Sequence, residues 1–503
     1  MIPKVHSITC IGIQAYTITI EVDDSLGLPQ IVIIGLPDQS IKESKDRIRS
    51  AITASGFKLP GKKFTINLAP ADIKKEGPGF DLPMAIGLLA KLGCVDKSCL
   101  EPFSFVGELA LDGSLRPIHG TLSMALGLQG TKKVMIVPWD NFREATLQNG
   151  VRVVPARHLK EVIEYITNPR SSFKRDIAIS EHTISEEYSV FLQDIKGQEC
   201  AKRALEVAVS GAHNILMIGP PGSGKTLLAK SLPSLLPHAT HSEFLDIVRI
   251  YSARSRMSKM SFMRPFRSPH HTISAPAMAG SGPSPKPGEI SLAHNGVLFL
   301  DEFSEFPRNV LETLRGPLED KEVTIARSKD TITYPSNFML VCAMNPCPCG
   351  YLGDRERKCR CSYDRIVKYR SRISGPIIDR IDIHIEVPRI QHYQLKAKAS
   401  GESSRKVRER IERARAIQAH RYNKHKFYTN ADLPPNLIEG FCHLDKESDQ
   451  VLDRAVKELH LSARAYHRIL KLARTIADIA GEAEITVEHV SEAVQYRTLD
   501  RGA

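Results

Sequence analysis

Eight residues from Gly219 to Thr226 form the strongest chemical signal in the sequence. They read Gly-Pro-Pro-Gly-Ser-Gly-Lys-Thr and follow the unbroken apolar run Ile215–Ile218. A glycine-rich loop can turn its backbone N–H groups around phosphate oxygens, and the helix that follows directs its positive dipole end at them. Lys225 is expected to contact the β and γ phosphates, and the Thr226 hydroxyl to bind Mg²⁺. The candidate nucleotide-binding residues are Gly219, Pro220, Pro221, Gly222, Ser223, Gly224, Lys225 and Thr226.

Asp301 and Glu302 supply the acidic groups that such a loop requires. They follow the apolar run Val297–Leu300, which is typical of a strand buried in a parallel sheet. Asp301 would then lie at the carboxyl edge of the sheet and hold Mg²⁺, directly or through water. Glu302 would lie nearer the γ phosphate and polarise the attacking water. The two motifs together predict ATP hydrolysis with Mg²⁺ as cofactor.

Cys347, Cys349, Cys359 and Cys361 place four thiols within fifteen residues. Four thiolates can close a tetrahedral zinc site, although the usual halves are C-x-x-C and here they are C-x-C. The alternative is a set of reduced surface cysteines. A metallated knuckle would present a rigid cationic surface to DNA, and its candidate DNA-binding residues are Arg355, Arg357, Lys358 and Arg360.

Bulk composition limits the class of protein. A chain of 503 residues predicts about three domains, and a 42% hydrophobic content is enough for real cores. The formal charge of +12 favours a polyanionic partner. The N-terminus lacks a cationic start followed by a long apolar run, and no apolar stretch reaches the roughly 18 residues of a membrane span. These patterns predict a soluble, cytoplasmic protein that does not associate with membranes and whose ten cysteines are thiols.

Residues 1–168 show the patterns of a mixed α/β domain. Apolar residues alternate with polar ones from Tyr16 to Val22, which predicts a half-buried strand. A helix is expected around Ile41–Ile52, and it ends at Gly56. Further strands are predicted at 30–34, 64–68, 105–109, 133–137 and 151–154, and further helices at 81–91, 120–128 and 156–165.

Two segments of this domain resemble the proteolytic domain of Lon and its relatives. They are Lys75–Asp81 and Gly107–Ile118. In those proteases a serine follows the Gly-Pro pair, and a lysine after the Pro-Ile segment activates it. Here Gly79 stands in place of the nucleophile, and Thr121–Met124 contain no lysine. The resemblance therefore implies a protease-like scaffold without peptidase chemistry, with a structural or interactive role such as capping a ring and touching DNA.

The centre of the chain resembles the magnesium-chelatase-like branch of the AAA+ ATPases. The resemblance is carried by Arg264–His271 and Ser281–His294, and a match to the bacterial ComM group extends along almost the whole chain. It implies an insert that projects toward the pore of a ring, expected to be a hexamer. It also implies ATP-driven DNA branch migration in homologous recombination, during integration of transforming DNA. His270 and His271 are interpreted as a solvated or substrate-facing pair rather than as metal ligands.

The resemblance also assigns roles to single residues. Asn345 would occupy the sensor 1 position, where its amide can hold the attacking water or the γ phosphate. Arg380 would reach the nucleotide of a neighbouring subunit, with Arg372 as the second candidate. Arg464 would touch the γ phosphate as sensor 2, and Gln198 would lie close to the adenine.

A short cationic hairpin is predicted between Glu322 and Tyr334. Its turn contains Arg327 and Lys329, and similar hairpins in related helicases point into the central channel and track phosphates. These two residues are further DNA-binding candidates. An ordinary hairpin with solvated charges is the alternative.

The sequence thus predicts a multidomain α/β protein with three folded parts. Residues 1–168 would form a Lon-protease-like α+β domain (ribosomal S5 domain 2-like), 169–193 a linker, 194–390 an AAA+ P-loop α/β core, and 391–503 a helical lid. The favoured function is a hexameric ATPase acting on single-stranded or branched DNA. The alternatives are a chelatase-like motor that remodels a protein partner, an ATP-dependent peptidase, and a nucleotide-gated DNA-binding scaffold.

Overall fold

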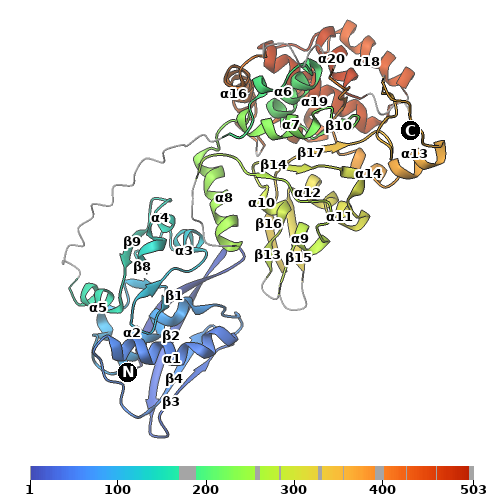
Figure 1. Cartoon of the computed structure of the whole chain (residues 1–503). Helices are drawn as coiled ribbons and strands as arrows, with labels where there is room; N and C mark the ends of the chain where they lie inside the picture. The colour runs from blue at the N-terminus through green and yellow to red at the C-terminus, as the bar shows by residue number, and fades with distance from the viewer. Residues whose placement is uncertain are drawn as a thin grey trace. The chain divides into compact units, whose positions relative to one another are not determined.

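The computed structural model describes residues 2–168, 188–254, 261–282, 285–326, 331–354, 356–390, 401–425, 427–459 and 461–497. The chain divides into two compact units, which are considered separately (Figure 1). The first unit contains Met1–Thr183, Ser242–Ser261 and Gly282–Pro287. The second contains Ile184–His241, Phe262–Ser281 and Gly288–Ala503.

A seven-stranded mixed sheet, in the order β3-β4-β2-β1-β5-β8-β9, forms the centre of the first unit. The alternation predicted in β2 is observed, since Ile18, Ile20 and Val22 are fully buried on one face. A small separate hairpin pairs β6 with β7. The strands are β1 (Lys4–Ile11), β2 (Gln14–Ser25), β3 (Gln30–Ile34), β4 (Lys63–Ala69), β5 (Phe103–Phe105), β6 (Glu108–Leu109), β7 (Leu115–Arg116), β8 (Val134–Pro138), β9 (Arg152–Ala156) and the short β13 (Lys286–Pro287).

The helices of the first unit include one that is distant in sequence. Helix α8 (His241–Arg254) lies in the chain between the glycine-rich loop and the acidic strand, yet all of it from Ser242 onward belongs to this unit. The Ser252 hydroxyl donates to Glu144 Oε1 (2.5 Å) and accepts from the Gly120 N–H (2.8 Å). The other helices are α1 (Gln39–Ala54), α2 (Asp81–Lys91), α3 (Thr121–Gly127), α4 (Phe142–Ala145) and α5 (Leu159–Thr167).

The second unit is built on a five-stranded sheet in the order β11-β14-β17-β10-β18. All of its neighbours run parallel, so the carboxyl ends of the strands meet at one edge. Three of the strands, β10, β14 and β17, are buried apolar runs, as a sheet covered on both faces requires. The strands are β10 (Ile215–Ile218), β11 (Phe266–Arg267), β14 (Val297–Leu300), β17 (Met339–Met344) and β18 (Ile383–Glu386).

One apolar core joins this sheet to the C-terminal helices. It contains buried side chains from α6, from the sheet and from α16, α19 and α20, and Figure 1 shows these red helices beside the green α6. The hairpin predicted at 322–334 is formed by β15 (Glu322–Ala326) and β16 (Thr331–Pro335), and β12 is Gly280–Ser281. The helices are α6 (Glu199–Gly211), α7 (Lys225–Ser231), α9 (Ala275–Ala279), α10 (Glu289–Leu292), α11 (Arg308–Glu312), α12 (Arg315–Asp320), α13 (Tyr363–Arg370), α14 (Gly375–Ile378), α16 (Ser404–Arg421), α17 (Pro435–Phe441), α18 (Lys446–Leu459), α19 (Ala463–Ala480) and α20 (Val487–Gln495).

The predicted mixed α/β architecture with a parallel sheet and a helical C-terminal part is confirmed. Some local predictions were wrong. The strand expected at 105–109 is interrupted at Val106 and Gly107, because β6 leaves the main sheet to pair with β7. Strand β1 was not predicted, since its apolar residues do not alternate regularly. The domain boundaries and the Lon-like fold type stay predictions, and the linker residues 169–187 lie outside the described part. Within that part, none of the helices combines the length and the apolar content needed to cross a membrane.

Candidate nucleotide and metal sites

The glycine-rich loop connects β10 to α7, as predicted. Gly222 (φ 78°) and Gly224 (φ 94°) adopt left-handed backbone conformations that favour glycine. The Lys225 ammonium is buried and donates to the carbonyls of Gly219 (2.7 Å) and Pro220 (3.0 Å). Burial lowers the pKa of Lys225 to about 8. A buried ammonium whose hydrogen-bond acceptors are all neutral would gain from an anionic ligand, which is what a phosphate supplies.

The acidic edge of the sheet lies beside this loop. The Thr226 hydroxyl donates to Asp301 Oδ2 at 2.7 Å. The Glu302 N–H donates to the other oxygen, Oδ1, at 2.9 Å. The two predicted Mg²⁺ ligands are therefore adjacent, and a hydroxyl with a carboxylate is a donor set that fits a hard cation such as Mg²⁺.

Asn345 follows β17, the strand that separates β14 from β10. Its Oδ1 lies 3.4 Å from Lys225 Nζ. Three neighbouring strands thus deliver the loop, the carboxylates and the amide to one edge, which is the usual ligand site of an open parallel sheet.

Gln198 contacts the backbone of the glycine-rich loop. Its side-chain amide donates to the carbonyls of Ser223 (3.2 Å) and Pro388 (2.6 Å). This places it in contact with the phosphate loop backbone; its expected proximity to adenine stays a prediction.

Sequence reasoning interpreted His271 as part of a solvated or substrate-facing pair and missed its contact with Glu302. Its Nδ1 lies 3.0 Å from Glu302 Oε2, whereas His270 Nδ1 contacts the Thr272 hydroxyl at 2.9 Å. The sequence signal was present, because these histidines follow a segment that becomes the edge strand β11. That strand is only two residues long, so its pattern was too short to recognise.

The three arginines with predicted nucleotide roles each pair with a carboxylate in the single chain. Arg380 is mostly buried, contacts Glu319 and donates to a backbone carbonyl. Arg372 is half exposed and lies 2.8 Å from Glu305. Arg464 is 69% exposed and lies 3.5 Å from an aspartate carboxylate. Their roles toward a nucleotide stay predictions.

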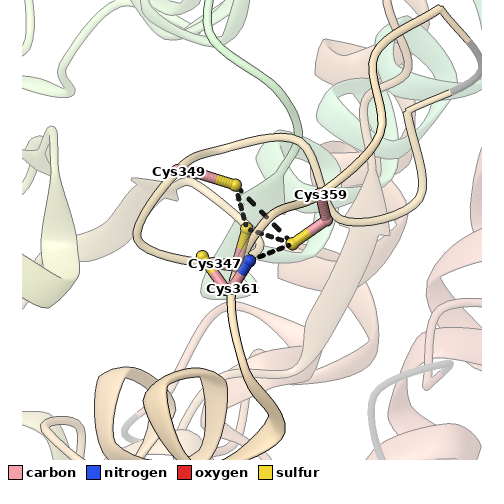
Figure 2. A group of neighbouring side chains, drawn as sticks. All are labelled: Cys347, Cys349, Cys359 and Cys361. Carbon is pink, nitrogen blue, oxygen red and sulfur yellow. Dashed lines mark hydrogen bonds between the residues drawn. The ribbon is translucent and has the colours of Figure 1, made fainter.

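The four cysteines predicted to bind zinc come together (Figure 2). The sulfurs of Cys347, Cys349 and Cys359 are 3.4 to 3.6 Å apart, and all four sulfurs lie within 4.8 Å of one another. A tetrahedral site with Zn–S bonds of about 2.3 Å requires sulfurs about 3.8 Å apart. Backbone N–H groups of Arg360 and Tyr351 lower the pKa of the Cys349 thiol to about 6, which favours the thiolate that metals bind. Burial and the neighbouring thiols raise the pKa of Cys359 to about 12, and burial raises the pKa of Cys361, so one thiolate is favoured in the absence of a metal ion. The cluster therefore fits a zinc ion in both spacing and chemistry.

The cysteine knuckle touches the phosphate loop. Gly350 adopts a φ of 82°, and a Cβ there would lie 2.7 Å from Pro221 Cδ. Asn345 lies two residues before Cys347, so the knuckle begins at the same sheet edge as the nucleotide site. Asp354, almost fully buried, pairs with Arg389 at 3.2 Å and holds the far side of the knuckle.

The described DNA-binding candidates are exposed on this knuckle. Arg357, Lys358 and Arg360 all face solvent. Arg357 also lies over the ring of Tyr351, 5.3 Å from its centroid, and donates to its hydroxyl at 2.9 Å. The remaining candidates, Arg327, Lys329 and Arg355, lie outside the described residues.

The protease-like segments of the first unit contain backbone and apolar groups where peptidase chemistry would need a nucleophile and an amine. A Cβ on Gly79 would meet Ile118 at 3.6 Å, an ordinary contact. The Leu122 N–H donates to Glu144 Oε1 at 3.0 Å, and the same oxygen accepts from Ser252 of α8. The absence of peptidase chemistry stays a prediction.

Comparison with known proteins agrees with the motifs. Residues 191–395 match the family described as magnesium chelatase, subunit ChlI, and residues 401–497 match its C-terminal part. Residues 20–141 match the family described as subunit ChlI of Mg-chelatase. A shorter similarity, 32% identity over 158 residues, covers 30% of this chain and 29% of Lon protease 2 of Bacillus subtilis.

Two relatives match over almost the full length. Competence protein ComM of Haemophilus influenzae is 44% identical over 505 residues, which cover 99% of this chain and 97% of that protein. YifB of Escherichia coli is 44% identical over 501 residues, with the same shares of both chains covered. With the nucleotide motifs gathered at one edge of a parallel sheet, the chain belongs to the ComM family of magnesium-chelatase-like AAA+ ATPases.

Proposed function

We propose that this protein hydrolyses ATP and uses the energy to move DNA branch points. The proposal of ATP hydrolysis rests on one observation. Five side chains lie together at one edge of the sheet: Lys225, Thr226, Asp301, Glu302 and Asn345. A phosphate-binding loop, a divalent-cation ligand pair and a carboxylate base are the parts that phosphoryl transfer to water requires.

Each side chain has a distinct task in this proposal. Mg²⁺, when bound, would neutralise negative charge on the phosphates. Thr226 and Asp301 hold the cation, and Lys225 contacts the phosphates. Glu302 accepts the proton of the attacking water, while the Asn345 amide orients that water or the γ phosphate.

The proposal includes a ring of identical subunits, with a hexamer as its expected form. Arg380 of one subunit would complete the nucleotide site of the next, Arg372 being the second candidate, and Arg464 would act from the lid. Support comes from the AAA+ family membership. The pairing of Arg380 with Glu319 in the single chain is compatible with this, since the arginine can exchange one anionic partner for another.

The DNA half of the proposal has three supports. A relative that matches over the full length is named a competence protein, the chain carries a charge of +12, and the cysteine knuckle exposes basic side chains. Lysine and arginine at such a surface contact phosphates without reading sequence. The proposed setting is recombination in the cytoplasm, including integration of transforming DNA. In recombination, a Lon-like first unit without peptidase chemistry would have a structural role or would contact a partner.

The deciding experiment is strand exchange on synthetic three- and four-way DNA junctions with ATP. Wild type should convert the junctions, Lys225→Ala should not, and Lys230→Ala should match wild type because this lysine is exposed on the same helix α7. Equal conversion by wild type and Lys225→Ala would refute the proposal.

A magnesium-chelatase-like motor that remodels a protein partner is the second candidate, favoured by the three family matches. ATP hydrolysis that DNA does not stimulate would support it. Tight ATP binding without turnover would instead support a nucleotide-gated scaffold, and casein degradation that Lys225→Ala abolishes would support a peptidase.

We also propose that the cysteine knuckle holds zinc. Replacing Cys347 and Cys349 together by serine should remove bound zinc and weaken DNA binding. The matched control is the replacement of the exposed Cys94 and Cys200 by serine, which should retain both. Wild-type protein that contains no zinc by elemental analysis would end this proposal.

A further inference from the structure

Helix α13 (Tyr363–Arg370) begins two residues after the last cysteine of the knuckle and presents an exposed aromatic ring. Cys361 belongs to the cysteine cluster (Figure 2), so a metal ion bound there would also fix the start of this helix. Tyr363 is 79% exposed. Val367, one turn further along, is 46% exposed and lies on the same face of the helix. The ring and the valine are therefore available to a partner.

Two other tyrosines of this region have neighbours that cover their rings. Arg357 lies over Tyr351, 5.3 Å from the ring centroid. Tyr369 is buried, and Arg372 lies 5.9 Å from its ring centroid. Within the described part of the chain, Tyr363 has no ring or cation packed on its own ring and no hydrogen bond to its hydroxyl. An exposed ring on a helix is a surface on which a planar group can stack.

Basic side chains lie on both sides of this ring in the sequence. From Glu356 to Arg370 the chain has six lysines and arginines and two acids, a formal excess of +4 apart from the cysteines. All six basic residues are exposed: Arg357, Lys358, Arg360, Arg365, Lys368 and Arg370. Among the residues that the structure describes, five of the six have no side-chain partner, and the exception is Arg357 on Tyr351. Cations that no carboxylate of the same chain pairs with attract a polyanion.

The combination of charge and ring favours a single-stranded nucleic acid as the partner. A second copy of this chain carries the same charge of +12, so its average field repels a cationic surface. A DNA duplex offers phosphates, but its base faces are stacked on one another. A single strand offers phosphates and open base faces together, and stacking on an aromatic side chain is tolerant of sequence because every base has a π face.

We propose that the knuckle and α13 form a binding surface for single-stranded nucleic acid, in which Tyr363 stacks on an unpaired base and the basic side chains contact the flanking phosphates. This rests on the proposed function, since it assigns part of the DNA to this surface. Exchange of strands at a branch point exposes unpaired bases, and this surface holds them.

The test measures binding of the full-length protein to two probes by fluorescence anisotropy, with and without ATP. The probes are a fluorescein-labelled oligothymidylate and a labelled duplex of equal length. Tyr363→Ala removes the ring, whereas Tyr363→Phe keeps the ring and removes the hydroxyl. Tyr428→Ala is the matched control, because this tyrosine is 64% exposed and lies in the C-terminal part of the chain, outside the knuckle and α13.

We expect Tyr363→Ala to weaken binding of the single strand about fivefold or more, while binding of the duplex changes less than about twofold. Tyr363→Phe and Tyr428→Ala should bind both probes as wild type does. Wild-type affinity of Tyr363→Ala for the single strand would overturn the inference. So would equal losses on both probes, or a loss in Tyr363→Phe as large as in Tyr363→Ala, because stacking of the ring would then not be the cause.

The phosphate contacts have their own readout. Lys368→Ala should reduce the slope of log binding constant against log salt for the single strand by about 0.7, the value for one lost phosphate contact. Lys446→Ala, at an exposed position that opens α18, is the control and should keep the wild-type slope. Equal slopes for wild type and Lys368→Ala would contradict the proposed phosphate contacts of α13.

A contact between copies of this chain at α13 predicts a different result. In that case Tyr363→Ala would lower ATP hydrolysis measured without DNA and reduce the particle mass under ATP, measured by mass photometry. We expect both quantities to match wild type. A loss of either would overturn the inference in favour of a subunit interface.

The wild-type protein separates this inference from the proposed function. If wild type binds the single strand and converts junctions while Tyr363→Ala binds the strand equally well, only the inference fails. If wild type binds neither probe, the DNA part of the proposed function fails, and the inference fails with it.

Discussion

Two regions of this chain have sequence patterns that resemble an enzyme site, and reactive side chains are predicted in only one of them. At the sheet edge of the second unit, Lys225, Asp301 and Glu302 present an ammonium and two carboxylates. In the first unit, the corresponding protease-like segments present Gly79 and Leu122. If the predicted resemblance to Lon holds, the first unit keeps the backbone pattern of such a site without its reactive groups.

The two regions also differ in what occupies their polar groups. In the second unit the lysine is buried on neutral carbonyls with a pKa lowered to about 8, so the region is prepared for an anion. In the first unit Glu144 is buried and satisfied by Leu122 and by Ser252 of α8. We propose that the former binds a ligand, whereas the latter contacts a helix of the same chain.

The largest expected effect concerns Arg380. Arg380→Ala should lower ATP turnover by about 1,000-fold, the scale of an arginine supplied by a neighbouring subunit. A mixture of Arg380→Ala and Lys225→Ala proteins should recover part of the activity, because some interfaces then combine an intact loop with an intact arginine. Hydrolysis measured across mixing ratios checks this. A mixture as inactive as its components would contradict a shared site.

The next effect concerns Glu302. Glu302→Gln should lower kcat about 100- to 1,000-fold, because an amide cannot accept the proton of the attacking water. ATP affinity, measured by fluorescent-nucleotide titration, should stay within about threefold. Glu322→Gln, at an exposed position that opens β15, is the matched control and should hydrolyse ATP normally. If Glu302→Gln hydrolysed ATP at the wild-type rate, the assignment of Glu302 as the general base would be wrong.

A smaller effect is expected in the first unit. Glu144→Ala should destabilise it by about 1 to 3 kcal/mol, because the Leu122 N–H and the Ser252 hydroxyl lose a buried acceptor. Calorimetric unfolding of the full chain measures the change, and Glu164→Ala, at an exposed position on α5, is the control. An unchanged unfolding transition would show that α8 does not depend on this contact.

The smallest effect is expected for Gly79→Ser. The position has ordinary space for a Cβ, with Ile118 at 3.6 Å, so stability should change by about 1 kcal/mol or less. The added hydroxyl should create no peptidase activity, because no lysine in 121–124 is present to activate it. If this variant degraded casein, the prediction that the first unit lacks the groups for peptidase chemistry would be wrong.

Much of the second unit could be predicted from sequence because its signals are local. Ile215–Ile218, Val297–Leu300 and Met339–Met344 are short apolar runs followed directly by functional residues, and the structure has strands at those bounds. The cysteine cluster could also be recognised from the sequence, since its four thiols are close in the chain. Such patterns need no knowledge of distant neighbours.

The predictions that failed or were missed depend on strand pairing, both in local hairpins and between distant segments. The 105–109 strand is divided because β6 pairs with β7, and β1 is a strand because β2 and β5 flank it. His271 reaches Glu302 only through the register of a two-residue edge strand.

The sequence by itself was enough to propose the nucleotide chemistry and to recognise the thiol cluster and the family, because residue types at fixed spacing suffice for these. The tertiary structure alone decided that α8 packs with the first unit and that His271 contacts Glu302. The physical reason is that these contacts come from helix docking and strand register, which bring together residues separated by long stretches of chain.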